Sequence, residues 1–145
     1  MTFFRVTTLV AASFAIAVLA WADGGALPRT DAPDDAEAYI INPKDGDTVK
    51  SPVTVVFGIR GMGVAPAGVD VPNTGHHHIV IDAPTPDLDK PIPADDHHVH
   101  FGGGQTEVTL ELSSGPHTLQ LVLGDRNHVP HTNAGVSKPI TITVK

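Results

Sequence analysis

The sequence predicts an all-β fold, an antiparallel β-sandwich of about seven strands. Seven short runs rich in β-branched and aliphatic residues follow one another, each separated from the next by turn residues. From residue 23 onward no stretch shows the 3.6-residue apolar period of an amphipathic helix. The runs are AYIINP (38–43), SPVTVVFGIRG (51–61), GHHHIVIDAP (75–84), HHVHFGGG (97–104), TEVTLELSSG (106–115), PHTLQLVLGD (116–125) and KPITITVK (138–145).

Alternating apolar residues mark the face of each run that we expect to pack in the core, because residues two apart in a strand lie on the same side. In four runs this face comprises Val53, Val55, Phe57 and Ile59; Val108, Leu110 and Leu112; Leu119, Leu121 and Leu123; and Ile140, Ile142 and Val144. The sequence LSSGPH between Leu112 and His117 has the Gly-Pro chemistry of a tight turn. It predicts that the two strands it joins pair as a hairpin.

Two connections are unusually long and are dense in proline and glycine. They are GMGVAPAGVDVPNTG (61–75) and APTPDLDKPIPADD (83–96), and both adjoin a histidine run. Loops of this length without structure of their own are uncommon and often functional.

The N-terminus is typical of a secretory signal peptide. One positive charge at Arg5 precedes an apolar stretch from Val6 to Ala20, and Ala20-Trp21-Ala22 has the small-x-small pattern of a cleavage site. We therefore expect a signal peptide over 1–22, a flexible linker rich in Gly, Pro and Asp over 23–37, and one β-sandwich domain over 38–145. This predicts a periplasmic or secreted protein that has no membrane segment after cleavage.

Charge and cysteine content narrow the class of partner. The chain has a formal net charge of −7, and all sixteen acidic residues follow the expected cleavage site. Nucleic acid and anionic membranes are therefore poor candidates, whereas cations are natural ones. Because the chain has no cysteine, any metal site must use nitrogen and oxygen ligands, which excludes zinc fingers, thiolate copper centres and iron–sulfur clusters.

Six of the nine histidines lie in two tight clusters. If Ile79 and Ile81 face the core, His76 and His78 share the opposite face, and Val99 and Phe101 likewise leave His98 and His100 together. On neighbouring strands these four imidazoles would converge on one metal ion. Imidazole suits copper, zinc and nickel, and the affinity order favours copper for a given site.

Further residues near these runs are candidates for the same chemistry. His117, His128 and His131 are additional metal-ligand candidates, with His128 and His131 in a loop that forms a second site or a lid. Asp125 is expected to orient an imidazole through its second nitrogen, as outer-shell carboxylates do around metals. The remaining candidates for a supporting shell are His77, His97 and Met62.

Three classes of function remain open at this point. The first is a metal-binding protein, for copper or alternatively zinc, that holds the ion or exchanges it with a periplasmic donor or acceptor protein. The second is a metalloenzyme in which three histidines leave an open position. The sequence feature against it is the lack of an obvious acid or base group beyond Asp95, Asp96 and Asp125. The third is a structural or adhesion sandwich, which would leave the histidines unexplained.

The strings GHHHIVID, PIPADDHHVHFGGGQTEVTLELSSGPHTLQLVLGDRNHVPH and SKPITITV resemble an exported bacterial family known as domain of unknown function 4399 (DUF4399). The similarity covers about residues 39–145 and includes both histidine clusters. The resemblance implies a small periplasmic β domain with immunoglobulin-like topology. It brings no activity with it, so function depends on the site itself.

Overall fold

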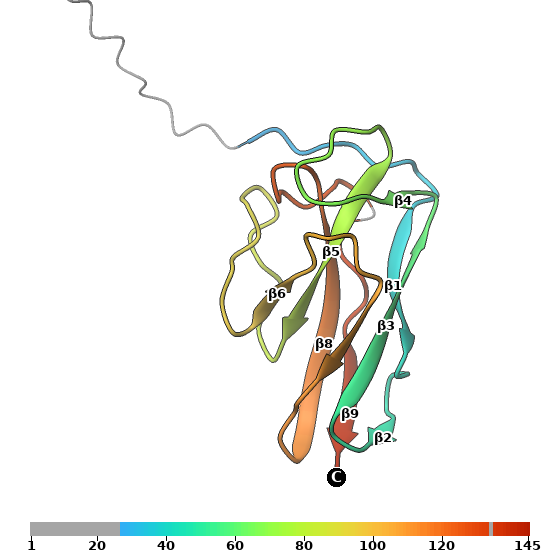
Figure 1. Cartoon of the computed structure of the whole chain (residues 1–145), viewed down its shortest axis with the longest axis vertical. Helices are drawn as coiled ribbons and strands as arrows, with labels where there is room; N and C mark the ends of the chain where they lie inside the picture. Colours follow the sequence, from blue (N-terminus) through green and yellow to red (C-terminus); the bar gives the residue numbers. More distant parts are fainter. Residues whose placement is uncertain (1–26, 134) are drawn as a thin grey trace, which may run out of the picture.

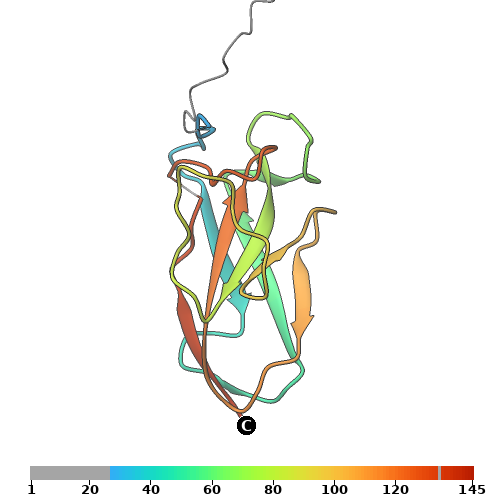
Figure 2. The ribbon, with the colours of Figure 1, turned by 90° about the vertical axis from the view of Figure 1, so that its left-hand side faces the viewer.

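In the part of the chain that the structure describes, nine strands form two sheets, which confirms the all-β prediction (Figures 1 and 2). The computed structural model describes residues 27–133 and 135–145. In that part of the chain no helix has the length and apolar character needed to cross a bilayer. The strands are β1 (Glu37–Asn42), β2 (Thr48–Val49), β3 (Val53–Arg60), β4 (Gly63–Val64), β5 (Thr74–Ile81), β6 (His98–His100), β7 (Glu107–Leu110), β8 (Gly115–Gly124) and β9 (Ile140–Val144).

The smaller sheet has the order β1-β3-β7, and the larger has the order β2-β9-β8-β5-β4 with β6 also paired to β5. The pairs β2–β9 and β4–β5 are parallel, and the other pairs are antiparallel. This arrangement is compatible with the immunoglobulin-like topology that the resemblance implies. Each of the seven predicted runs contains a strand, whereas the two-residue strands β2 and β4 were not predicted.

The core lies between the two sheets and is built from the predicted alternation. Val55 of β3, Ile79 of β5, Leu121 of β8 and Ile142 of β9 are fully buried in one cluster. Val108, Leu110 and Leu112 pack against this cluster from the β7 side. The apolar parity assigned from the sequence therefore identifies the core-facing side of these strands correctly.

The predicted hairpin at LSSGPH is wrong. β7 pairs with β3 in the smaller sheet, whereas β8 pairs with β5 and β9 in the larger one. The connection therefore carries the chain from one sheet to the other. Both strands point an apolar face at the same core, and that pattern arises equally when two strands face each other across a sandwich.

The outer face of the larger sheet is covered by loops. Ile92, from the loop between β5 and β6, packs on Val80 and Val122 of this face, together with Val136. The Ile92 N–H also donates to the carbonyl of His128, 2.8 Å away, in the loop after β8. The loop after β5 and the loop after β8 thus meet above the sheet, and they enclose the outward-facing residues of β5.

Parts of the N-terminal predictions fall outside this description. The expected signal peptide, 1–22, lies outside the described residues, and the linker is described only from residue 27. In Figures 1 and 2 the segment from residue 27 to β1, drawn in blue, runs across the same end of the sandwich as the loop after β8. Ala32 within it is 7% exposed, so this stretch packs against the domain.

Candidate metal centre

β5 divides its three consecutive histidines between the two faces of the sheet. His77 faces the core, where its ring centroid lies 5.2 Å from that of Phe57. His76 and His78 face outward beneath the covering loops, and each is 1% exposed. The strand places them as the sequence predicts, because residues two apart share a face.

The register of β6 on β5 brings one histidine of the second run into the site and takes the other away from it. His78 is paired with His100, and Val80 is paired with His98. Because the pair is antiparallel, His100 is the residue of β6 closer to His76. His98 lies two residues further along β6, roughly 7 Å further from His76 than His100 does. The predicted quartet is therefore wrong in including His98. The Nδ1 of His98 lies 2.7 Å from the Asp95 carboxylate instead.

The fourth imidazole of the cluster comes from His128, in the loop after β8. Its backbone has a positive φ of 64°, a conformation in which His, Asn and Asp are enriched among non-glycine residues. The Asp125 carboxylate holds this turn, because its Oδ1 accepts the N–H groups of Asn127 and Val129 at 2.8 and 3.1 Å. His128 thus joins the first site itself, where the sequence had indicated a second site or a lid.

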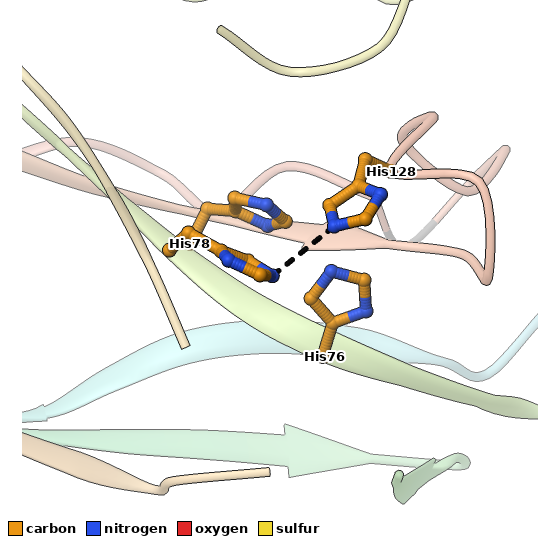
Figure 3. Close-up of side chains that lie close together, drawn as sticks. His76, His78 and His128 are labelled. Carbon is orange, nitrogen blue, oxygen red and sulfur yellow. Dashed lines mark hydrogen bonds between the residues drawn. The ribbon is translucent and has the colours of Figure 1, made fainter. Parts of the chain in front are cut away.

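Four imidazoles converge on the outer face, from His76, His78, His100 and His128, and they could hold a metal ion. One nitrogen from each lies within 4.8 Å of the others. The His76 ring centroid is 4.8 Å from that of His78, 5.0 Å from that of His100 and 4.8 Å from that of His128. In Figure 3 His76 and His78 project from β5 toward His128 on the facing loop. Two imidazoles from β5 thus meet one from the short strand β6 and one from the loop after β8.

Two glycines give these rings the room they occupy. A Cβ at Gly102 would lie 2.5 Å from Cε1 of His100, and one at Gly124 would lie 2.9 Å from Cε1 of His78. Gly124 is also the β8 partner of His76. Any side chain at either position would push a ring out of the cluster. The sequence indicated FGGG only as a sharp turn, so this steric role of glycine was missed.

Burial keeps the two inner imidazoles neutral. Burial, followed by the neighbouring His128 and His100 rings, lowers the pKa of His76 to about 4. Burial, followed by His76, His100 and His128, lowers the pKa of His78 to about 3. Burial, followed by His128, also lowers the pKa of His100. Neutral imidazole is the form that binds metal, so the two inner rings are ligand-ready far below neutral pH.

Two of the inner nitrogens lack a hydrogen-bond partner. Nε2 of His76 and Nδ1 of His78 are both buried and unpaired. Leaving a buried polar atom unsatisfied typically costs about 1–3 kcal/mol, and each such atom calls for an explanation, an ion among them. A cation is an acceptor of imidazole lone pairs, so the donor set and its burial both fit a metal.

Other predicted ligands lie elsewhere. His117 is near the start of β8, where Nδ1 contacts Asp82 at 2.6 Å and Nε2 contacts the Ser113 carbonyl at 2.9 Å. The hydrogen bond to Asp82 is the largest of the effects that raise its pKa. His131 is buried, with its nitrogens 3.2 and 3.1 Å from the carbonyls of Thr30 and Thr74. Neither imidazole belongs to the four-membered cluster, because its nitrogens are engaged by protein oxygens.

The proposed supporting residues also separate. His77 contacts Phe57 on the core side of β5, and Nδ1 of His97 lies 2.8 Å from the Ile81 carbonyl. Asp125 was expected to orient an imidazole through its second nitrogen. Its oxygens instead accept the Thr30 hydroxyl and two backbone N–H groups of the turn that carries His128. Met62 is half-buried directly before β4, and its place in a supporting shell stays a prediction.

A family model described as a domain of unknown function, DUF4399, matches residues 55–145. The chain belongs to this family. The match contains all four histidines of the cluster and starts within β3, later than the sequence resemblance indicated. No curated protein and no solved structure matches the chain. The function of this DUF4399 protein therefore has to be argued from its site.

The depressed histidine pKa values predict a loss of stability in acid. The pKa values of His76, His77 and His78 are about 4, 4 and 3, against 6.5 for an ordinary histidine. Between pH 6.5 and 4 the unfolded chain therefore binds more protons than the folded one, so stability falls as the pH falls through this window. Each group contributes a slope of up to about 1.4 kcal/mol per pH unit. Urea unfolding of the metal-free protein at pH 7.5, 6 and 5 measures this change in the free energy of unfolding.

His77 supplies the matched control for this experiment. It lies on the core side of β5 with neither nitrogen hydrogen-bonded, so His77→Leu should remove one proton's share of the slope. The raised pKa of His117 acts oppositely: its contribution is full below pH 6.5 and is lost as the pH rises through the folded value. Equal stability at pH 7.5 and 5 would show that the inner histidines are not held neutral.

Proposed function

We propose that this protein is a periplasmic metal-binding protein that holds copper through His76, His78, His100 and His128. The observation that carries the proposal is the convergence of four nitrogens within 4.8 Å, two of them from imidazoles that are 1% exposed. A strongly perturbed cluster of titratable groups of this kind is a functional-site signature. Imidazole nitrogens without thiolate or carboxylate favour copper over earlier first-row metals, with zinc as the alternative.

The unequal burial of the ligands supports exchange of the ion with a partner protein. His100 is exposed and His128 is half-buried, whereas His76 and His78 are covered. Nε2 of His100 and Nε2 of His128 lie 3.2 Å apart. An incoming ligand can therefore replace this outer pair first, while the inner pair keeps the ion. The exchange partner is a periplasmic donor or acceptor that presents its own copper ligands.

The surroundings of the carboxylates favour holding an ion over catalysis. Asp95 accepts the His97 N–H at 2.9 Å and contacts His98, so its oxygen is already engaged. The Asp125 oxygens are taken by Thr30 and by the turn that carries His128. Two of the three groups that the sequence offered as acid or base, Asp95 and Asp125, thus have structural partners. The enzyme hypothesis has no comparable support from the geometry of these residues.

His100→Ala tests the site, with His98→Ala as the matched control on the same strand. His100 is exposed, so its loss should not disturb folding, yet it removes one ligand. We expect copper affinity to fall by more than the roughly 10–100-fold typical of losing an outer-shell group. His98→Ala should leave affinity within about twofold, because His98 lies outside the cluster. Competition titrations with Cu(II), Cu(I) and Zn(II) measure both variants.

Four outcomes of these titrations would contradict the proposal in whole or in part. Equal losses in the two variants, or none in His100→Ala, would show that the four-histidine cluster is not the site. A parent protein that binds neither copper nor zinc would instead favour the structural or adhesion function. If the parent protein bound Zn(II) more tightly than copper, against the affinity order, the ion held by the site would be zinc and not copper.

Export to the periplasm is supported by the sequence pattern of residues 1–22. The mature protein should begin at Asp23 and should be recovered in the periplasmic fraction of the native cell. Intact-mass measurement of that fraction checks both points. A chain that retains Met1 would indicate an uncleaved, anchored form.

A further inference from the structure

Residues 29–32, within the stretch expected to be a linker, are held along the loop after β8 by hydrogen bonds. Arg29 donates from Nε to the Pro130 carbonyl at 3.0 Å and from Nη2 to the His131 carbonyl at 2.7 Å. The Thr30 carbonyl accepts the Thr132 N–H at 3.0 Å. The Thr132 hydroxyl in turn donates to Asp31 at 2.9 Å. We call residues 29–32 the strap.

The strap reaches His128 through Asp125. The Thr30 hydroxyl donates to Oδ2 of Asp125 at 2.7 Å, and Asp125 is only 2% exposed. Its Oδ1 accepts two backbone N–H groups of the turn, and its own carbonyl accepts the His128 N–H at 2.9 Å. A buried carboxylate needs such partners, because an unpaired one is costly. Thr30 therefore fixes the carboxylate that holds His128 at its positive φ.

His131 ties the strap to β5 as well. Its Nδ1 lies 3.2 Å from the Thr30 carbonyl, and its Nε2 lies 3.1 Å from the carbonyl of Thr74, the first residue of β5. His131 is 1% exposed. The buried ring of His131 thus lies between the strap and the strand that carries His76, and its single N–H can donate to either carbonyl. Figure 1 shows the blue segment beside the loop after β8 at one end of the sandwich.

We propose that the strap is a part of the metal site, in which Thr30 and Asp125 are positioning residues for the ligand His128. This inference rests on the proposed function and adds a means of regulation to it. Release of the strap frees the turn at Asp125 and withdraws one ligand, while the histidines on β5 and β6 stay in place. The strap lies outside residues 55–145, which match the family, and cleavage after Ala22 would leave it attached to the mature chain.

A double-mutant cycle between Thr30 and His128 tests the proposal. Thr30→Val removes the hydroxyl at nearly constant volume, and Thr30→Ser keeps it. In the parent background Thr30→Val should lower Cu(II) affinity about 10–100-fold, the usual effect of losing a group that orients a ligand. In the His128→Ala background it should change affinity by less than about twofold, because the ligand it positions is already gone. Thr30→Ser should retain the parent affinity.

Thr54→Val is the matched control, since it removes the 3.2 Å hydroxyl contact with Thr109 on the smaller sheet. It should leave Cu(II) affinity unchanged. Two results would overturn the proposal: no effect of Thr30→Val on affinity, or an equal loss in the parent and His128→Ala backgrounds. The second result would show that the hydroxyl supports the fold generally and does not act through His128.

A metal-free measurement separates failure of the strap from failure of the proposed function. The His128 ring centroid lies 4.8 Å from both the His76 and the His100 centroid, so ring-to-ring NOEs should connect them in the apo protein. Thr30→Val should weaken these NOEs, and Thr30→Ser and Thr54→Val should keep them. Unchanged NOEs in Thr30→Val would show that the strap does not position His128, whether or not the parent protein binds copper.

Discussion

The register of β5 between β6 and β8 is the constraint on which the site depends. It sets His100 beside His78 on one side, and it sets Gly124 opposite His76 on the other. Because side chains alternate along a strand, a slip of one residue would turn the histidine face into the core and Ile79 out of it. The core and the histidine cluster are therefore specified together by one strand, each from its own face. The short strand β6 adds His100 to the cluster only because it follows this register.

Burial of neutral imidazoles gives the site its chemistry and weakens the fold in acid. The loops that cover the outer face lower the pKa values of His76 and His78 and leave nitrogens without hydrogen bonds. A site of this kind is less stable without its ion than a packed apolar face would be. Binding of a metal to the folded state alone stabilises that state by mass action. Folding and metal binding should therefore support each other in this protein.

The sequence predicted the features that follow from periodicity and missed those that depend on tertiary contacts. Parity along the strands was enough to place Ile79 in the core and to put His76 and His78 on the opposite face. It could not separate His98 from His100, because that choice depends on how the long loop before β6 sets the pairing. Nor could parity distinguish strands that pair from strands that face each other, hence the wrong hairpin. The turn at His128 and the strap contacts of Thr30 depend on hydrogen bonds between particular residues. Such bonds leave no periodic pattern in the sequence.

The central claim is that four imidazoles bind one metal ion on the outer face of the larger sheet. X-ray absorption spectroscopy of the copper-loaded protein tests it most directly, because the outer-shell scattering of imidazole counts the histidines that are bound. The account predicts about one copper per chain with four imidazole nitrogens at about 2.0 Å, the distance usual for metal–histidine bonds. A copper shell with fewer than three imidazoles, or one made chiefly of oxygen, would contradict it.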